Sequence, residues 1–384
     1  MVCPVWRVTG REAHTARGRL HLLDRLTPAT ATEAYAEILS MCLLCGACGA
    51  ACPRGLDPAA SLRAAREQLS RNAGNQPALR ILAQKLLASP ALLTLLATFG
   101  LPLLRKLPAD SGMRLRLGLG GAPLQDLQTD LPSPTTDKAS VASFHGCYAT
   151  HLRPDISTAI HRVVTHTTGK PPLSLPSQCC CGLAAEANGN SSTAIRLAKH
   201  NIAAFSGNNL PIVVACASCW HQLARYPQLL AEEPEWRERA ECFADRLVEF
   251  SSFAAKTLHE PLPSRPSDRT VRRQVVCHDP CHLRFPVQAT APQREVVQAL
   301  PDVTLVELPD GPRCCGQGGL FHLAHPALSA AIRAPLLDQL RMTGAQQVTT
   351  TCSGCLIHLE QGQATQPEDT PSPIHLALLL AEYL

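Results

Sequence analysis

The chain has 384 residues, which is enough for two or three domains with a sizeable buried core. Its hydrophobic content of 45% and charged content of 17% are those of an ordinary globular protein, and its net charge of +4 is too small and scattered to indicate nucleic-acid binding. The 18 cysteines require an explanation. Because no apolar N-terminal segment precedes a cleavage site, we expect a cytoplasmic protein with reduced thiols, which favours metal binding or redox chemistry over disulfides.

The N-terminal region, residues 1–106, is predicted to form a helical iron–sulfur module. Four of its cysteines have the C-x2-C-x2-C-x3-C-P spacing of bacterial ferredoxins: they are Cys42, Cys45, Cys48 and Cys52. Asp57-Pro58 then predicts the start of a helix over 59–69. The short gaps let one segment surround a cluster, and the proline after the last cysteine favours [4Fe–4S] over a zinc knuckle.

The partner of this ferredoxin-like run is incomplete. Such runs usually occur in pairs, and the fourth cysteine of each run binds the cluster of the other. Cys3-Pro4 resembles the end of a first run whose three leading cysteines are absent. The crossed scheme leaves Cys52 without a cluster and assigns four cysteines to one cubane: Cys3, Cys42, Cys45 and Cys48. In the alternative, Cys52 is the fourth ligand and Cys3 is a surface thiol.

A stretch without charged residues follows, from Leu86 to Leu104. Its 19 residues would just span a bilayer, but Pro90, Gly100 and Pro102 interrupt it. We therefore predict a buried or interface-covering helical pair, with peripheral membrane docking as an alternative. The next segment, 107–140, is rich in Gly, Pro, Ser and Thr and is predicted to be a linker.

The remainder of the chain is an internal duplication, with predicted domains at 141–260 and 274–384. Five cysteines recur at offsets of 134 or 136 residues, which indicates two similar domains rather than a solenoid. The first copy contains Cys147, Cys180, Cys181, Cys216 and Cys219. The second copy contains Cys281, Cys314, Cys315, Cys352 and Cys355.

Each copy is predicted to alternate strands with helices, which indicates a parallel α/β domain. The predicted strands are 141–146, 173–175 and 212–215, and then 274–278, 303–308 and 347–350. The predicted helices are 155–167, 192–205 and 244–258, and then 293–300, 327–342 and 374–384. The cysteine groups follow the strands, so they should gather at the carboxyl edge of each sheet, where such folds build sites.

Five thiolates from three loops exceed the four ligands that Zn²⁺ takes, so each copy is predicted to hold an iron–sulfur centre. Gly182 and Gly316 follow the paired cysteines, where a backbone without Cβ can approach a cluster closely. Two alternatives stay open. The groups could be zinc sites, or they could carry out thiol–disulfide chemistry, because adjacent cysteines and Cys-x-x-Cys are redox-competent motifs.

The remaining candidates are predicted to be structural. Cys179 has no counterpart in the second copy and is interpreted as a packing residue, and Cys242 and Cys277 are interpreted as core residues. His221 and His358 lie at different offsets from their Cys-x-x-Cys pairs, which indicates satisfied or surface histidines rather than haem ligands. No G-x-G-x-x-G follows a strand, so flavin or NAD is expected on a partner.

Several motifs occur together along the chain: Cys3-Pro4, Gly10, Glu12, Arg17-Gly18-Arg19, the segment His278 to Leu283, and the segment Cys314 to Gly319. With the ferredoxin-like run and the two Cys-Cys-Gly domains, this combination resembles the iron–sulfur subunit of glycolate oxidase over essentially the whole chain. Similar modules occur in the cysteine-rich subunit of heterodisulfide reductase, in the membrane-anchoring subunit of anaerobic glycerol-3-phosphate dehydrogenase and in lactate-oxidation proteins. In the heterodisulfide reductase relatives, each five-cysteine motif holds a non-cubane [4Fe–4S] cluster.

The resemblance implies an electron-transfer subunit of a flavin-dependent 2-hydroxyacid dehydrogenase of the glycolate or D-lactate type. Such a subunit takes electrons from a flavin-bearing partner and passes them towards quinone, at the inner face of the membrane or within a complex. The alternative is a catalytic thiol–disulfide reductase similar to the cysteine-rich subunit of heterodisulfide reductase. This chain departs from the family in its incomplete first run, which puts one cubane in doubt or indicates an upstream start. Its two complete Cys-x-x-Cys pairs weaken the choice of glycolate over other substrates.

Overall fold

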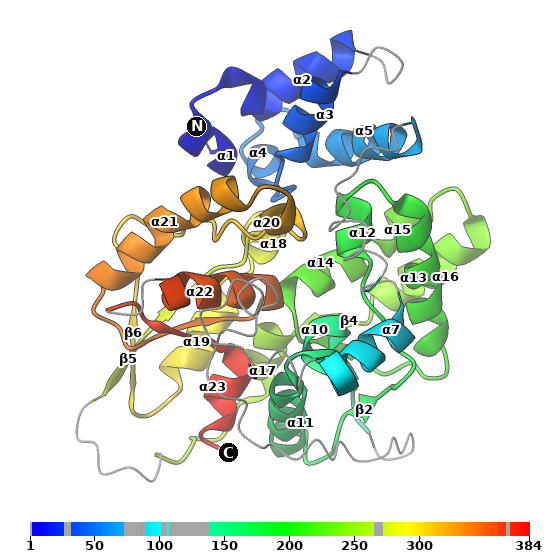
Figure 1. Ribbon diagram of the computed structural model, residues 1–384. Coiled ribbons are helices and arrows are strands. Elements are labelled where there is room, and N and C mark those ends of the chain that lie inside the picture. Colours follow the sequence, from blue (N-terminus) through cyan, green and yellow to red (C-terminus); the bar gives the residue numbers. More distant parts are fainter. Residues whose placement is uncertain are drawn as a thin grey trace.

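The computed structural model describes residues 2–26, 32–72, 86, 89–100, 106, 139–264, 272–365 and 369–384. An N-terminal helical module lies above two α/β domains that stand side by side (Figure 1). Each α/β domain contains a four-stranded sheet. The predicted fold class, an iron–sulfur module followed by two duplicated α/β domains, is confirmed. The predicted linker, 107–140, lies outside the described residues except for its last two.

The N-terminal module consists of short helices that pack around Leu39 and Leu62, which are almost fully buried. The elements are α1 (Pro4–Thr9), η1 (Glu12–His14), α2 (Ala16–Arg25), α3 (Glu33–Ser40), α4 (Ala47–Ala50) and α5 (Pro58–Asn72). The Asp57 carboxylate accepts hydrogen bonds from the N–H groups of Ala59 and Ala60, so it caps α5 as predicted.

The described part of the apolar stretch forms α7 (Pro90–Leu95) followed by η2 (Leu96–Gly100). Among the described residues, no helix has the length and apolar character needed to cross a bilayer. Leu93 is buried, whereas Leu92, Leu95 and Phe99 are 44%, 56% and 72% exposed. Burial is therefore limited to one side of α7, and the alternative that this segment covers an interface stays a prediction.

The first α/β domain has a fully parallel sheet in the order β2-β1-β3-β4. Its strands are β1 (Ala142–Phe144), β2 (Leu173–Ser174), β3 (Ile212–Val214) and β4 (Leu247–Glu249). Its helices are α10 (Gly146–His151), α11 (Pro154–Thr168), α12 (Leu183–Ala187), α13 (Ser191–Ala204), α14 (Ala217–Ala224), α15 (Tyr226–Leu229), α16 (Pro234–Ala244) and α17 (Phe250–Thr257).

The second α/β domain repeats this topology with the order β6-β5-β7-β8, again fully parallel. Its strands are β5 (Arg273–Cys277), β6 (Val303–Val306), β7 (Gln347–Thr350) and β8 (Ser372–His375). Its helices are α18 (Cys281–Arg284), α19 (Ala291–Gln298), α20 (Phe321–Ala324), α21 (Pro326–Met342), α22 (Ser353–Thr365) and α23 (Leu376–Ala381). The equivalent strand order supports duplication of one ancestral unit.

Two predicted helices are wrong at their starts. The range 244–258 contains β4 and then α17, and the range 374–384 contains the end of β8 and then α23. In each copy a capping side chain ends the strand and starts the helix: Glu249 accepts from the N–H of Ser252, and His375 accepts from the N–H of Ala377. Each fourth strand was missed because it runs directly into an apolar helix, which hides the change of period.

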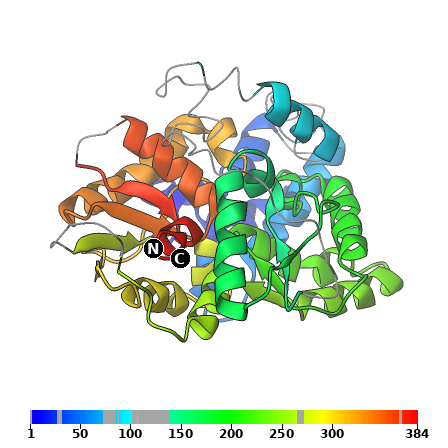
Figure 2. The same cartoon turned by 90° about the horizontal axis from the view of Figure 1, so that it is seen from below.

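The two domains share one hydrophobic core. Helices α11 and α17 of the first domain pack against α23 and α19 of the second, and Figure 2 shows α11 beside α23. The core combines side chains from both copies, including Val213, Phe250, Val275, Leu356 and Leu380. A backbone hydrogen bond of 2.9 Å from the Ala217 N–H to the Thr351 carbonyl also crosses the boundary. The copies are therefore held in a fixed mutual orientation.

Arg153 forms a buried ionic link across this interface. Its guanidinium donates to both carboxylate oxygens of Asp155 on its own domain, at 3.0 and 2.7 Å, and to Glu360 on α22 of the other domain at 2.7 Å. The carboxylates of Asp155 and Glu360 are both largely buried. Each therefore depends on Arg153 for compensation of its charge.

Replacing Arg153 with Leu should destabilise the protein by about 3–5 kcal/mol, because two buried carboxylates lose their shared cation. The measurement is thermal unfolding of anaerobically purified protein by circular dichroism. Adding Glu360→Leu should recover part of the loss, since an apolar pair leaves fewer unsatisfied charges. Arg162→Leu is the control, because Arg162 is exposed and donates to the Leu384 carbonyl. Equal effects of Arg153→Leu and Arg162→Leu would contradict this account.

Candidate metal centres

Four cysteines of the N-terminal module line one small cavity: Cys3, Cys42, Cys45 and Cys48. Cys3 precedes α1, Cys48 lies in α4, and the other two lie in the loop between α3 and α4. Burial raises the pKa of Cys45 to about 12 and that of Cys48 to about 11. Thiols this close together and this well buried ionise readily only when a cation shares the site, which is the situation of metal ligands.

Cys52 lies apart from these four cysteines. Its thiol faces the backbone N–H groups of Leu56, Arg54 and Gly55, and these hydrogen bonds lower its pKa. The cavity lined by Cys3 does not include Cys52 among its described lining residues. The structure therefore brings together the four ligands of the crossed scheme and places Cys52 elsewhere.

Two buried arginines position the loops that carry these cysteines. Arg19 donates to the Ile38 carbonyl at 3.0 Å and to the His14 carbonyl, which also accepts from the Cys3 thiol at 3.5 Å. Arg66 donates to the Cys42 carbonyl at 2.6 Å and to the Ala187 carbonyl, also at 2.6 Å. Because Ala187 ends α12, Arg66 ties the cluster loop to the first α/β domain.

The ten cysteines of the duplicated groups meet in a single cavity of about 160 Å³ between the two domains. Each group lies at the carboxyl edge of its sheet, as predicted. Cys147 follows β1, Cys216 and Cys219 follow β3, and the equivalent residues follow β5 and β7. Cys45 also lines this cavity, so the N-terminal group adjoins the duplicated ones. Sequence reasoning predicted each group separately but not their meeting.

The two duplicated groups touch each other through their equivalent cysteines. The Cys216 sulfur of the first copy accepts a hydrogen bond of 3.4 Å from the Ser353 N–H, which follows Cys352 of the second copy. The Ser218 hydroxyl lies 3.1 Å from the Cys352 sulfur and 2.9 Å from Nδ1 of His282. The domain interface thus supplies polar contacts to sulfur atoms of both groups.

The sulfur atoms divide into a minority that favour the thiolate form and a majority that do not. Hydrogen bonds from Cys147, Cys219 and Cys355 lower the pKa of Cys180, Cys216 and Cys315, respectively. Hydrogen bonding to these neighbours, burial and like charge raise the pKa of most other thiols, to about 12 for Cys352. The protein alone therefore stabilises only part of the negative charge that a set of metal-binding thiolates carries.

The two glycines that follow the paired cysteines have a backbone reason for their presence. Gly182 and Gly316 have φ of +87° and +84°, in the left-handed region that side chains disfavour. A Cβ at Gly316 would also lie 2.5 Å from the Ser329 carbonyl oxygen on α21, whereas the nearest atom at Gly182 would be 3.4 Å away. Backbone conformation and helix packing thus account for the glycines without a cluster in contact.

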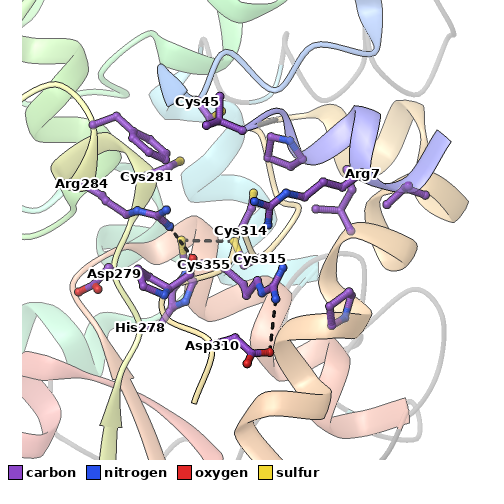
Figure 3. A pocket seen from close by; sticks show the side chains of 18 residues that line it. Arg7, Cys45, His278, Asp279, Cys281, Arg284, Asp310, Cys314, Cys315 and Cys355 are labelled. Atoms are coloured by element: carbon purple, nitrogen blue, oxygen red, sulfur yellow. Dashed lines mark hydrogen bonds and ion pairs between the residues drawn. The ribbon is translucent and has the colours of Figure 1, made fainter. Parts of the chain in front are cut away.

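A second cavity, of about 550 Å³, adjoins the second cysteine group and Cys45 (Figure 3). Its lining includes the guanidinium groups of Arg7, Arg284 and Arg313. Arg284 donates to the Pro312 carbonyl at 2.8 Å, and Arg313 pairs with Asp310 at 3.4 Å. These cations lie where they can offset negative charge at the second group. In the first copy, Thr150 stands at the position of Arg284 and Cys179 at the position of Arg313.

The other cysteines lie away from these cavities. Cys179 is buried, and its thiol faces the Asn201 side chain at 3.4 Å, which fits the predicted packing role. Cys277 is buried on β5, as predicted. Cys242 is exposed on α16, so its prediction as a core residue is wrong. Its position inside a helix does not bury it, because this side of α16 faces solvent.

The two histidines that follow the Cys-x-x-Cys pairs are packed against neighbouring residues. His221 stacks on His282 with ring centroids 4.5 Å apart, and His358 donates from Nδ1 to the Cys315 carbonyl. Both therefore have structural contacts, as predicted. Sequence reasoning did not single out His278 and His282, which lie beside the second cysteine group. The available signal was their position in the His-Asp-Pro-Cys-His segment around Cys281.

Comparison with known proteins agrees with this division of the chain. Residues 1–56 match the 4Fe-4S dicluster domain, and residues 141–224 and 275–360 each match the cysteine-rich domain. A probable glycolate oxidase iron-sulfur subunit of Bacillus subtilis is 26% identical, over 99% of this chain and 90% of that protein. The glycolate oxidase iron-sulfur subunit of Escherichia coli is 24% identical, over 94% and 88%. The chain is a homologue of the glycolate oxidase iron–sulfur subunit.

Lactate utilization protein A of Bacillus pumilus is a further relative, 27% identical over 53% of this chain and 83% of its own length. A hypothetical protein from Helicobacter pylori has a similar solved structure with a TM-score of 0.46 and 14% identity, covering 67% of this chain and 52% of that one. The sequence matches confirm the resemblance to glycolate oxidase subunits and the assignment of [4Fe–4S] as the cofactor of the N-terminal domain.

The match to a dicluster domain suggests why Cys52 lies apart from the other four cysteines. In a dicluster arrangement the fourth cysteine of one run binds the other cluster. Here the cavity-lining set takes its fourth member, Cys3, from the other run. In the crossed scheme, Cys52 would instead be the ligand of a second cluster, and this assignment stays a prediction.

Cys3→Ala should abolish or strongly reduce the cubane signal, whereas Cys52→Ala should leave it nearly unchanged, because only Cys3 shares a cavity with the other three cysteines. The measurement is iron content and low-temperature EPR of the reduced, anaerobically purified chain. Cys242→Ala is the control for loss of an exposed thiol. If Cys52→Ala alone removed the signal, the crossed scheme would be wrong.

Proposed function

We propose that this chain is the iron–sulfur electron-transfer subunit of a flavin-dependent 2-hydroxyacid dehydrogenase of the glycolate or D-lactate type. The names of its homologues, glycolate oxidase iron-sulfur subunit and lactate utilization protein A, support a role as an iron–sulfur subunit of a hydroxyacid oxidation system. The finer assignment adds a flavin-bearing donor, a quinone acceptor, and peripheral association with the inner face of the membrane.

The continuity of the cysteine groups is the observation that carries this proposal. Cys45 of the N-terminal group raises the pKa of both Cys281 and Cys314 of the second copy by like charge, in addition to the larger effect of burial. Cys352 of the second copy and Cys216 of the first are in turn hydrogen-bonded neighbours. Iron–sulfur clusters supply one-electron redox chemistry when bound. Three adjoining sites thus form a series suited to electron transfer.

The role of the protein in such a series is to hold the ligands and set the local charge. Fifteen cysteines are candidate ligands: Cys3, Cys42, Cys45 and Cys48 for one cubane, Cys52 in place of Cys3 in the alternative scheme, and the two groups of five. Buried arginines fix the first loop, and Arg284 lies beside the second group. Hydrogen bonds, burial and nearby charge are the means by which proteins tune such centres.

The organic half of the reaction is assigned to a partner. Oxidation of a 2-hydroxyacid needs a cofactor that accepts a hydride or its equivalent, and a flavin both accepts it and releases electrons singly. The sequence contains no dinucleotide-binding fingerprint after a strand. We therefore place the substrate pocket and the flavin on another subunit, and this chain between that subunit and the quinone.

One contact favours a second candidate, a catalytic thiol–disulfide reductase. The sulfur atoms of Cys315 and Cys355 lie 3.4 Å apart in a buried hydrogen bond, and a close dithiol can undergo disulfide exchange. The same proximity is required of two ligands of one metal centre. The sharing of the cavity by all three groups favours the electron-transfer role, since a dithiol reductase needs only one pair.

Anaerobic co-purification tests the proposal. The tagged chain, expressed from its native host, should be brown, contain at least about four irons per chain, and bring down a flavoprotein. Adding glycolate or D-lactate to that complex should reduce the iron–sulfur centres, as followed by EPR, while the isolated chain should not respond. A double Cys42→Ala/Cys45→Ala chain, which lacks two ligands of the N-terminal group, serves as the matched control.

Two results would overturn it. If the isolated chain reduced a disulfide substrate about as fast as a reductant supplied it with electrons, the thiol–disulfide reductase function would be supported instead. A colourless chain that contains zinc and no iron would point to structural metal sites.

A further inference from the structure

The two cysteine groups differ at one buried position next to their sulfur atoms. His278 in the second copy corresponds to Phe144 in the first, by the same offset of 134 residues that relates Cys281 to Cys147. Phe144 ends β1, and His278 directly follows β5, so both occupy the carboxyl edge of an equivalent central strand. The duplication therefore supplies an internal comparison between an imidazole and an apolar ring at one site.

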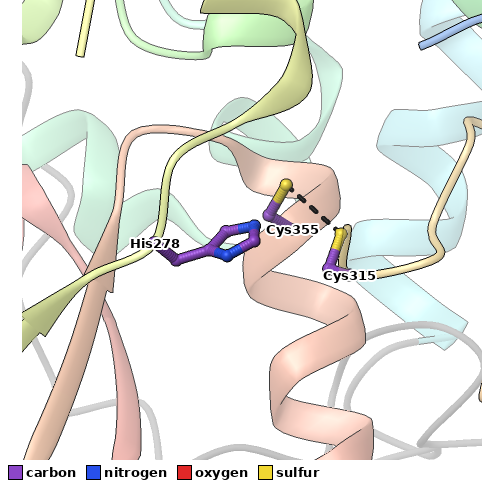
Figure 4. A group of neighbouring side chains, drawn as sticks. All are labelled: His278, Cys315 and Cys355. Carbon is purple, nitrogen blue, oxygen red and sulfur yellow. Dashed lines mark hydrogen bonds between the residues drawn. The ribbon is translucent and has the colours of Figure 1, made fainter. Parts of the chain in front are cut away.

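The imidazole of His278 is directed at two cysteines (Figure 4). A ring nitrogen of His278 and the sulfur atoms of Cys315 and Cys355 all lie within 4.8 Å of one another, and the three residues are buried. His278 is 1% exposed, and its Nδ1 has no hydrogen-bond partner in the described part of the chain. The ring also hydrogen-bonds to the Cys315 thiol. A buried Nδ1 without a partner is costly, so it requires a partner of its own.

The neighbouring histidine shows what a satisfied ring looks like at the same site. His358 donates from Nδ1 to the Cys315 carbonyl, and its Nε2 lies 3.1 Å from the Ser329 hydroxyl. Both nitrogens of His358 therefore have protein partners. His278 differs, because its Nδ1 has no partner among the described residues and its ring hydrogen-bonds to the Cys315 sulfur.

Phe144 presents no donor atom to the first group. Its ring is fully buried and packs against Phe205 with centroids 6.2 Å apart. At the position of His278, the first group therefore has no nitrogen donor. Nitrogen and sulfur donors in one site are both good ligands for iron and zinc.

We propose that His278 is a nitrogen ligand of the metal centre in the second cysteine group, bound to the same metal atom as Cys315 and Cys355, whereas the first group has no nitrogen donor at the equivalent position, Phe144. This inference rests on the proposed function in one respect, that the second group binds a metal. It has a consequence for the potential of the second centre. Replacing thiolate by imidazole ligands raises the reduction potential of iron–sulfur centres. The second centre should therefore be easier to reduce with His278 than with a cysteine at the same position.

The test uses holoprotein purified anaerobically from cells grown with ¹⁵N-histidine. Pulsed EPR of the reduced or oxidised paramagnetic state should show a strongly coupled nitrogen in the wild-type protein. His278→Phe, which copies the first group, should lose that coupling, and His358→Gln should keep it. His278→Cys restores a soft ligand, so it should retain iron without the nitrogen coupling even if His278→Phe loads poorly.

Redox titration followed by EPR gives an independent readout. At a fixed potential near the midpoint, the reduced-to-oxidised ratio of the second centre should fall at least tenfold in His278→Cys, equivalent to 59 mV for a one-electron couple. An unchanged nitrogen coupling in His278→Phe, or only the weak coupling of a hydrogen-bonded imidazole in the wild type, would overturn the proposal.

The metal content separates this inference from the proposed function. If the cysteine-rich domains contain zinc instead of iron, the electron-transfer role fails. X-ray absorption at the zinc edge would then still test the ligand: a mixed nitrogen and sulfur shell that becomes all sulfur in His278→Cys supports it. An all-sulfur shell in the wild-type protein would refute it.

Discussion

The concentration of sulfur at the junction of two sheets is the constraint on which the rest of the structure depends. Ten cysteines from two domains and Cys45 from the N-terminal module line one buried cavity. Hydrogen bonding to neighbouring cysteines, burial and mutual repulsion raise the pKa of most of these thiols, which disfavours their thiolate forms. A bound metal centre would supply the missing positive charge, and metal binding and folding would then be coupled.

The packing of the three parts follows from this constraint. The carboxyl edges of the two sheets face each other because α11 and α17 pack against α23 and α19. The N-terminal module covers the remaining side, with α1 against α21 and α5 against α12. Arg66 fixes that arrangement by donating to carbonyl groups of both the cluster loop and α12. Loss of any one part would expose sulfur sites that the other two build.

The two cysteine groups of the duplication differ in the charges and donor atoms beside them. The second group adjoins Cys45, opens to the larger cavity, and has Arg284 beside Cys314. The first group has Phe144 and Thr150 at the positions that correspond to His278 and Arg284. A pair of similar sites with different charge and donor sets is what an ordered series of redox centres requires. Identical sites would give electrons no preferred direction.

Local patterns in the sequence determined the cysteine groups, the repeat and the parallel α/β class. Cysteine spacing and the alternation of strands with helices can both be read from residues that are close together in the chain. They failed at β4 and β8, where a short strand joins an apolar helix, and at the exposed Cys242. Only the tertiary structure showed that Cys3 lines the same cavity as Cys42, Cys45 and Cys48, that the duplicated groups share a cavity, and that His278 faces sulfur. Those contacts join residues far apart in the chain, so they depend on how helices pack between domains and not on any local period.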